Sequence, residues 1–70
     1  MEDDRIKILN MLEGKSYYFN FSEGGGAEIY KINNLYFLFE VPIYGGLPQY
    51  NGKYNITEID KMIEAYKSWI

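Results

Sequence analysis

The dipeptide Asn33-Asn34 is the feature that most constrains how this chain can fold. It separates two runs rich in β-branched and aromatic residues, 27–32 and 35–41. Asparagine tolerates the positive φ angles that both central residues of a tight hairpin turn require. The pattern therefore predicts an antiparallel hairpin. A two-residue turn also fixes the register, because Ile32 must then pair with Leu35.

This register divides the hairpin side chains between two faces of a sheet. One face holds three apolar or mixed pairs, which are Ile32 with Leu35, Tyr30 with Phe37, and Glu28 with Phe39. We expect this face to be the core. The opposite face holds Lys31 with Tyr36, Ile29 with Leu38, and Ala27 with Glu40. We expect it to be a subunit interface or a ligand-facing surface, the alternative being an ordinary exposed sheet face.

Two further segments have the properties of strands. Residues 15–22 alternate in polarity, with Tyr17, Phe19 and Phe21 on one side, as a half-buried strand requires. The glycines at 24–26 end this segment and predict a flexible hairpin connection. A short fourth strand is possible near residues 50–54, and the sequence leaves its formation open.

A helix is expected at each end of the chain. Asp3 and Asp4 precede an apolar run that stops at Gly14, which is typical of a helix with an acidic start. The apolar side chains of this run span more than half of the helix circumference: Ile6, Ile8, Leu9, Met11 and Leu12. Either one packing partner is too few to cover them, or the helix is short and leaves one or two aliphatics exposed.

Near the C-terminus, Thr57 is expected to cap a second helix, with Asp60 three residues on in a capping-box arrangement. The apolar residues of this helix form a narrow stripe that we expect to dock on the sheet: Ile59, Met62, Ile63, Tyr66, Trp69 and Ile70. The whole chain, 1–70, is therefore expected to be a single α+β domain. Its small antiparallel sheet of three or four strands is flanked by an N-terminal and a C-terminal helix.

The small size of the chain makes its aromatic residues important. A domain of 70 residues buries only about 60% of the surface that its unfolded chain exposes, so its stability margin is thin. No cysteine is present to form a disulfide, while 8 Tyr, 4 Phe and 1 Trp are present. We expect a core set of Phe19, Phe21, Phe37, Phe39, Tyr66 and Trp69, and a surface set of Tyr36, Tyr44, Tyr50 and Tyr54. Self-association is the other expected source of stability, so a homo-oligomer is predicted.

Composition argues against catalysis. The absence of cysteine and histidine excludes thiolate metal sites, redox pairs and the usual physiological-pH general base. The hydroxyl residues have local explanations at strand ends, a helix cap and a polar helix face, and none lies in a nucleophile motif: Ser16, Ser22, Thr57 and Ser68. We therefore expect a non-enzymatic protein with no catalytic residues, no metal site and no cofactor.

Charge and hydropathy limit the partners. A net charge of -3 with a single arginine, Arg5, disfavours binding to double-stranded nucleic acid. No stretch approaches the ~20 apolar residues of a membrane span, and the acidic N-terminus is unlike the basic start of a signal peptide. We expect a cytoplasmic protein with no membrane partner.

The segment 42–55 is the best candidate for recognition. Tyrosines surround the Gly45-Gly46 pair, and they offer rigid stacking surfaces while glycines allow close backbone approach. The predicted ligand-binding residues are Lys31, Tyr36, Tyr44, Gly45, Gly46, Gln49, Tyr50, Lys53 and Tyr54. The alternative is that the tyrosines pack against the core and the glycines only turn the chain.

The C-terminal half contains Leu38-Phe39-Glu40, Pro42-x-Tyr44-Gly45-Gly46 and Ser68-Trp69. In size, composition and this layout, the chain resembles short accessory proteins of Firmicutes, which are low-GC Gram-positive bacteria, and of their phages. The resemblance implies a phage or mobile-element accessory role, including counter-defence, in the cytoplasm of the host cell. It assigns no role to any residue of this chain.

Two functional hypotheses follow. The first is a non-catalytic, homo-oligomeric binding protein that sequesters a small nucleotide-like immune signal, acting as a sponge. The second is a protein–protein inhibitor or adaptor whose tyrosine-rich surface binds a host defence protein.

Overall fold

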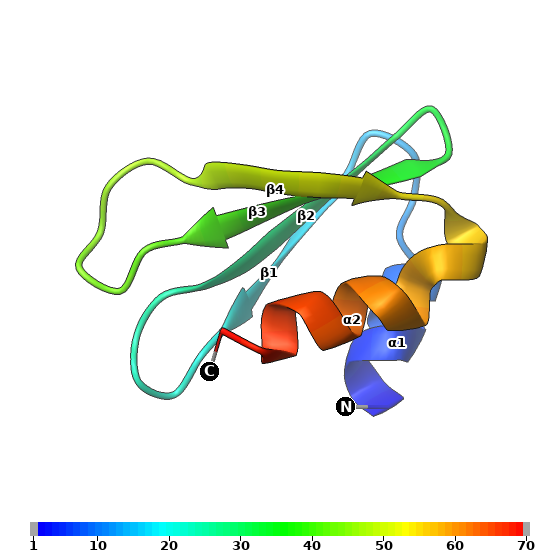
Figure 1. Cartoon of the computed structure of the whole chain (residues 1–70). Coiled ribbons are helices and arrows are strands. Elements are labelled where there is room, and N and C mark those ends of the chain that lie inside the picture. The colour runs from blue at the N-terminus through cyan, green and yellow to red at the C-terminus, as the bar shows by residue number, and fades with distance from the viewer. Residues whose placement is uncertain (1, 70) are drawn as a thin grey trace.

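The computed structural model describes residues 2–69, with side chains for 4–69. The elements follow the order α1 (Glu2–Leu9), β1 (Ser16–Asn20), β2 (Gly26–Ile32), β3 (Leu35–Val41), β4 (Gln49–Tyr54), a 3-10 turn η1 (Ile56–Glu58) and α2 (Ile59–Lys67). The strands form one antiparallel sheet in the order β1-β2-β3-β4. Both helices lie on the same face of this sheet (Figure 1). The expected α+β fold is confirmed, and the fourth strand is present.

The hairpin between β2 and β3 forms as expected. Asn33 and Asn34 have φ angles of 55° and 63°, and Ile32 pairs with Leu35. The Glu13 carboxylate accepts hydrogen bonds from the backbone N–H groups of both turn residues, at 3.1 Å in the case of Asn34. These bonds tie the turn to the segment that follows α1.

The assignment of the core face was wrong. The side chains buried under the helices are those of Ala27, Ile29, Tyr36 and Leu38, while Phe37 and Phe39 lie on the uncovered face. The reason is the pairing of β1 with β2, which sets Phe19 opposite Ala27. The aromatic side of β1 therefore shares a face with Ala27 and Ile29, and the helices can cover only one face.

The turn between β1 and β2 explains why this pairing forms. Gly24 and Gly25 have φ angles of 101° and 72°, in the left-handed region that favours glycine. A Cβ atom on Gly26 would overlap the carbonyl oxygen of Phe19, so a side chain does not fit at this position. The glycine run thus fits the close approach of the two strands.

Tyr66 of α2 is the centre of the packing between helices and sheet. Its ring stacks on that of Phe19 at a centroid distance of 5.5 Å, and the small Ala27 lies across from Phe19. The Tyr66 hydroxyl donates a hydrogen bond of 2.7 Å to Asp4 Oδ2 of α1. Burial and this carboxylate raise the pKa of Tyr66 well above its usual value, so the hydroxyl keeps its proton. The contact joins both helices to the sheet.

The start of the C-terminal helix differs from the expectation. Asn55, not Thr57, is the capping residue: its side chain accepts from the Thr57 N–H at 2.9 Å, and Glu58 accepts from the Asn55 N–H at 3.1 Å. The capping box therefore belongs to η1, one half-turn earlier than expected. The apolar stripe of α2 is confirmed, since Ile59, Met62, Ile63 and Tyr66 are buried and Trp69 packs against them. Ile70 lies outside the described residues.

The N-terminal helix is shorter than its apolar run. It ends at Leu9, and Ile8 and Met11 are buried, whereas Ile6, Leu9 and Leu12 are exposed. The α1 side chains of Glu2 and Asp3 are not among those described. In the part of the chain that is described, no helix has the length and apolar content needed to cross a membrane.

Tyr36 provides a test of the corrected core. Its side chain is fully buried, and its hydroxyl has no hydrogen-bond partner among the described residues. An unsatisfied buried hydroxyl costs roughly 1–3 kcal/mol, so Tyr36→Phe should leave the free energy of unfolding unchanged or raise it by about 1 kcal/mol. Urea denaturation measures this change.

The matched control is Tyr66→Phe, which removes a hydroxyl bonded to a carboxylate and should lower the free energy of unfolding by about 1–2 kcal/mol. A loss of 1 kcal/mol or more in Tyr36→Phe would contradict the assignment.

Candidate functional site

Among residues 4–69, none covers the face of the sheet opposite the helices, and this face is rich in aromatic side chains. We call this surface the open face. The strand register assigns to its centre Glu28, Tyr30 and Ile32 of β2, Leu35, Phe37 and Phe39 of β3, and Tyr50 and Lys53 of β4. Tyr18 of β1 lies on the same side, opposite Glu28.

Aromatic rings on three strands contact one another across the open face. Tyr30 and Phe39 meet edge to face at 5.5 Å between ring centroids, and Phe39 and Tyr50 do so at 5.6 Å. Phe37 and Tyr50 lie 6.4 Å apart in a tilted arrangement. A bulge between β3 and β4 sets Tyr50 opposite Phe39, where a regular ladder would place Asn51. The bulge therefore completes this aromatic cluster.

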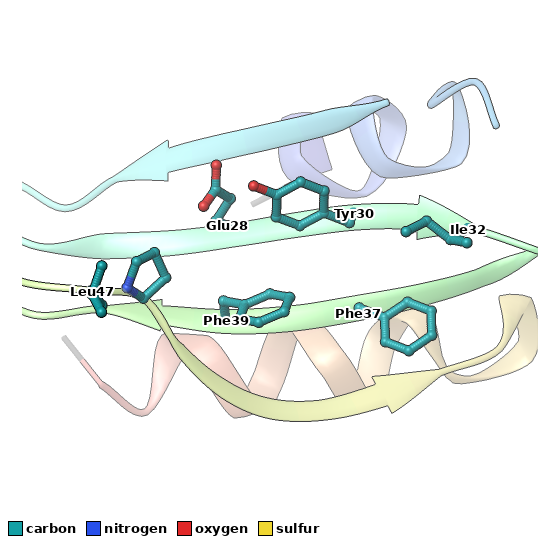
Figure 2. A pocket seen from close by; sticks show the side chains of 7 residues that line it. Glu28, Tyr30, Ile32, Phe37, Phe39 and Leu47 are labelled. Carbon is teal, nitrogen blue, oxygen red and sulfur yellow. The ribbon is translucent and has the colours of Figure 1, made fainter. Parts of the chain in front are cut away.

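A shallow pocket of about 480 Å³ lies over these rings. It is lined by Glu28, Tyr30, Ile32, Phe37, Phe39, Leu47 and Pro48. Figure 2 shows the side chains of β2 and β3 side by side, with Leu47 of the β3–β4 loop at one end and the helices behind the sheet. Two glycines in this loop, Gly45 and Gly46, have φ angles of 87° and 107°, which allow the chain to turn back toward the sheet.

The pocket has one polar end. The carboxylate of Glu28 and the hydroxyl of Tyr30 point toward each other (Figure 2). The negative charge of Glu28 raises the pKa of Tyr30, with smaller contributions from desolvation and from a hydrogen bond to the same carboxylate. Tyr30 therefore stays protonated at neutral pH. The pair offers a ligand one strong acceptor and one hydroxyl.

The other charge of the open face is a cation. Among the strand residues, Glu28 and Lys53 are the two charged side chains on this face. Glu28 pairs with Phe39 on β3, whereas Lys53 pairs with Phe37, two residues along the same strand. A carboxylate and an ammonium group therefore lie at diagonal positions, with the aromatic cluster between them.

A second hollow of about 390 Å³ lies at the edge strand β1, beside both helices. Its lining is polar and apolar in similar measure, and it includes Asp4, Lys7, Tyr17, Tyr66 and Lys67. These groups already contact other parts of the fold: Tyr66 donates to Asp4, and the Lys7 ammonium lies 5.3 Å from the centre of the Tyr17 ring. The open face is thus the stronger candidate.

Three predicted ligand-binding residues are directed to the helix-covered face. Tyr36 is 0% exposed, so the expectation that it lies at the surface was wrong. Lys31 donates a 3.0 Å hydrogen bond to the carbonyl oxygen of Met11, and its ammonium lies 5.5 Å from the centre of the Tyr36 ring. Tyr54 is half-buried and packs against the core. All three stabilise the fold.

The other predicted residues lie in the β3–β4 loop or on β4. Tyr50 and Lys53 belong to the open face, and Tyr50 is 57% exposed. Tyr44 is 99% exposed at the loop, which also contains Gly45 and Gly46. Gln49 is exposed at the start of β4. Their contact with a ligand stays a prediction.

Sequence reasoning missed the pocket residues of β2 and β3 because it assigned them to the core. Both hairpin faces are apolar enough for burial, so composition does not choose between them. The signal that decides is the register of β1, since Phe19 and its neighbours must share the core face with their partners on β2. That register depends on the exact shape of the glycine turn.

Comparisons with protein-family models, curated proteins and solved structures give no match to this chain.

Proposed function

We propose that this protein is a non-catalytic binding protein that holds a small, flat, nucleotide-like molecule against the open face. The observation that supports this proposal is the aromatic floor of the pocket, which has Glu28 in its lining and Lys53 on the neighbouring strand, opposite Phe37. Aromatic rings provide stacking surfaces for a base, and a volume of about 480 Å³ lies within the usual range for small-molecule pockets.

The two charges match the polarity of a nucleotide. An amino-bearing base is a hydrogen-bond donor, which suits the Glu28 carboxylate and the Tyr30 hydroxyl, whereas a phosphate suits the Lys53 ammonium. The β3–β4 loop closes one end of the pocket through Leu47 and Pro48. A ligand bound in this way would be retained and not transformed, as expected of a sponge that sequesters an immune signal. The counter-defence setting is supported by the resemblance to phage accessory proteins alone.

A second candidate function is that of an inhibitor or adaptor that binds a host protein. The observation in its favour is the exposure of large side chains on the β3–β4 loop, where Tyr44 is 99% and Leu47 85% exposed. Tyrosine is enriched among the residues that dominate binding energy at protein interfaces. In this case the loop would be the first contact with the partner, and the open face would extend the interface.

The ligand hypothesis predicts a thermal shift with nucleotide probes. Adenosine monophosphate, guanosine monophosphate and a cyclic dinucleotide should be tested at 1 mM, each with the purified protein. A ligand at 100 times its Kd adds about 2.7 kcal/mol of stability, and about 1 kcal/mol raises the Tm of a domain this small by roughly 4–8 °C. A probe present at 100 times its Kd should therefore raise the Tm by about 10 °C or more.

Glu28→Gln should reduce this shift at least severalfold, because it weakens the acceptor at the polar end of the pocket. Glu64→Gln is the matched control, since Glu64 is exposed on α2, away from the open face. If none of the probes raises the Tm, the nucleotide-like ligand is excluded.

The second candidate predicts capture of a host protein by the tagged chain in approximately equal amounts. Tyr44→Ala should release this protein while leaving the Tm within about 2 °C of the wild type, because a fully exposed side chain adds little to stability. Retention of the partner by Tyr44→Ala would contradict the role of the loop.

A further inference from the structure

We propose that the open face pairs with the open face of a second copy of this chain, and that the pocket becomes a chamber shared by the two copies. The pairing rests on the composition of the face itself. Only the use of the chamber for a ligand rests on the proposed function.

The open face exposes large apolar side chains. Tyr50 is 57%, Leu47 85% and Ile32 45% exposed, and all three belong to or border the same aromatic surface. An antiparallel sheet with one covered face normally presents polar side chains on the other. A large contiguous apolar patch on a soluble domain indicates an interaction site.

The area of the open face is sufficient for a dimer interface. Four strands spaced ~4.8 Å apart and about 20 Å long present a flat area on the order of 400 Å². Two paired faces therefore present roughly 800 Å² of flat area, and the relief of the side chains brings the buried surface to about 1,000 Å², the lower bound for a specific interface. The open face is thus large enough to hold a second copy, without help from the helices.

The charges on the open face are complementary between two copies. The strands contribute one carboxylate, Glu28, and one ammonium, Lys53, to this face. Face-to-face pairing needs a two-fold axis that lies in the interface plane. Such an axis, placed over the point between Phe37 and Phe39 and at right angles to the line from Glu28 to Lys53, sets Glu28 of each copy opposite Lys53 of the other. The interface is therefore self-complementary, although each whole chain has a net charge of -3.

The pocket on the open face is too shallow to enclose a small ligand by itself. A small-molecule site normally buries 70–90% or more of its ligand, which a shallow hollow on an open sheet does not achieve. A second copy would supply the missing roof, lined by the same aromatic residues. The small-ligand site is therefore incomplete without the partner copy, which makes the homo-oligomer part of the mechanism.

Sedimentation equilibrium over 5 µM to 1 mM protein tests the pairing. The wild type should be a dimer at the upper concentrations. Glu28→Lys and Lys53→Glu should each raise the dimer Kd at least tenfold, because like charges then face each other across the interface. The double variant Glu28→Lys with Lys53→Glu should restore the Kd to within threefold of the wild type.

Lys61→Glu is the control for net charge, because it makes the same charge change as Lys53→Glu on the exposed side of α2, and it should leave the Kd unchanged. Tyr50→Asp is a second test that needs no charge pair: it introduces a carboxylate into the aromatic cluster and should give a monomer. Far-UV circular dichroism verifies that each variant is folded.

A wild type that stays monomeric at 1 mM overturns the proposal. Dimers that persist in both single variants and in Tyr50→Asp also overturn it, and they would point to another surface, such as the exposed aliphatics of α1. Failure of the double variant to recover overturns the pairing of Glu28 with Lys53. A dimer that binds none of the nucleotide probes would contradict the proposed function but support the pairing of the open faces. A monomer that binds one of the probes would support the proposed function but contradict the pairing.

Discussion

The pairing of β1 with β2 determines the rest of the structure. It sets Phe19 opposite Ala27, so that the aromatic side of β1 and the aliphatic side of the hairpin form one surface. The ring of Tyr66 stacks on Phe19, and α2 docks there. The other side of the hairpin, with Tyr30, Phe37 and Phe39, is left without a cover. A different register of β1 would exchange the two faces.

A 70-residue domain has little hydrophobic surface to spare, yet a cluster of aromatic rings on one sheet face lies outside the core. The ordering of those rings by the bulge at Tyr50, and the diagonal charges around them, are consistent with a surface that meets another molecule. The same surface accounts for both the proposed ligand site and the proposed dimer, because a second copy that pairs with the sheet face also covers the pocket.

Local features of the fold could be predicted from the sequence, whereas features that depend on one strand's position relative to another could not. The Asn33-Asn34 turn, the register of the hairpin and the stripe of α2 follow from turn chemistry and periodicity. The choice of core face depends on the conformation of a glycine turn, for which the sequence permits several shapes. The cap was expected at Thr57, and the structure places it at Asn55, two residues earlier. Of the residues on the open face, Tyr50 and Lys53 were predicted as site residues. The β2 and β3 residues were not, because they were assigned to the core.

An NMR dilution series of the uniformly labelled protein, from 1 mM to 20 µM, tests the role of the open face most directly. We expect the amide resonances of the residues around the pocket to shift with concentration, above all those of Glu28, Tyr30, Phe37 and Phe39, while those of α2 stay fixed. We also expect contacts between copies from the rings of Phe37 and Phe39 at high concentration. Spectra that do not change on dilution, or changes confined to α1 and α2, would contradict the claim that the open face is the working surface of this protein.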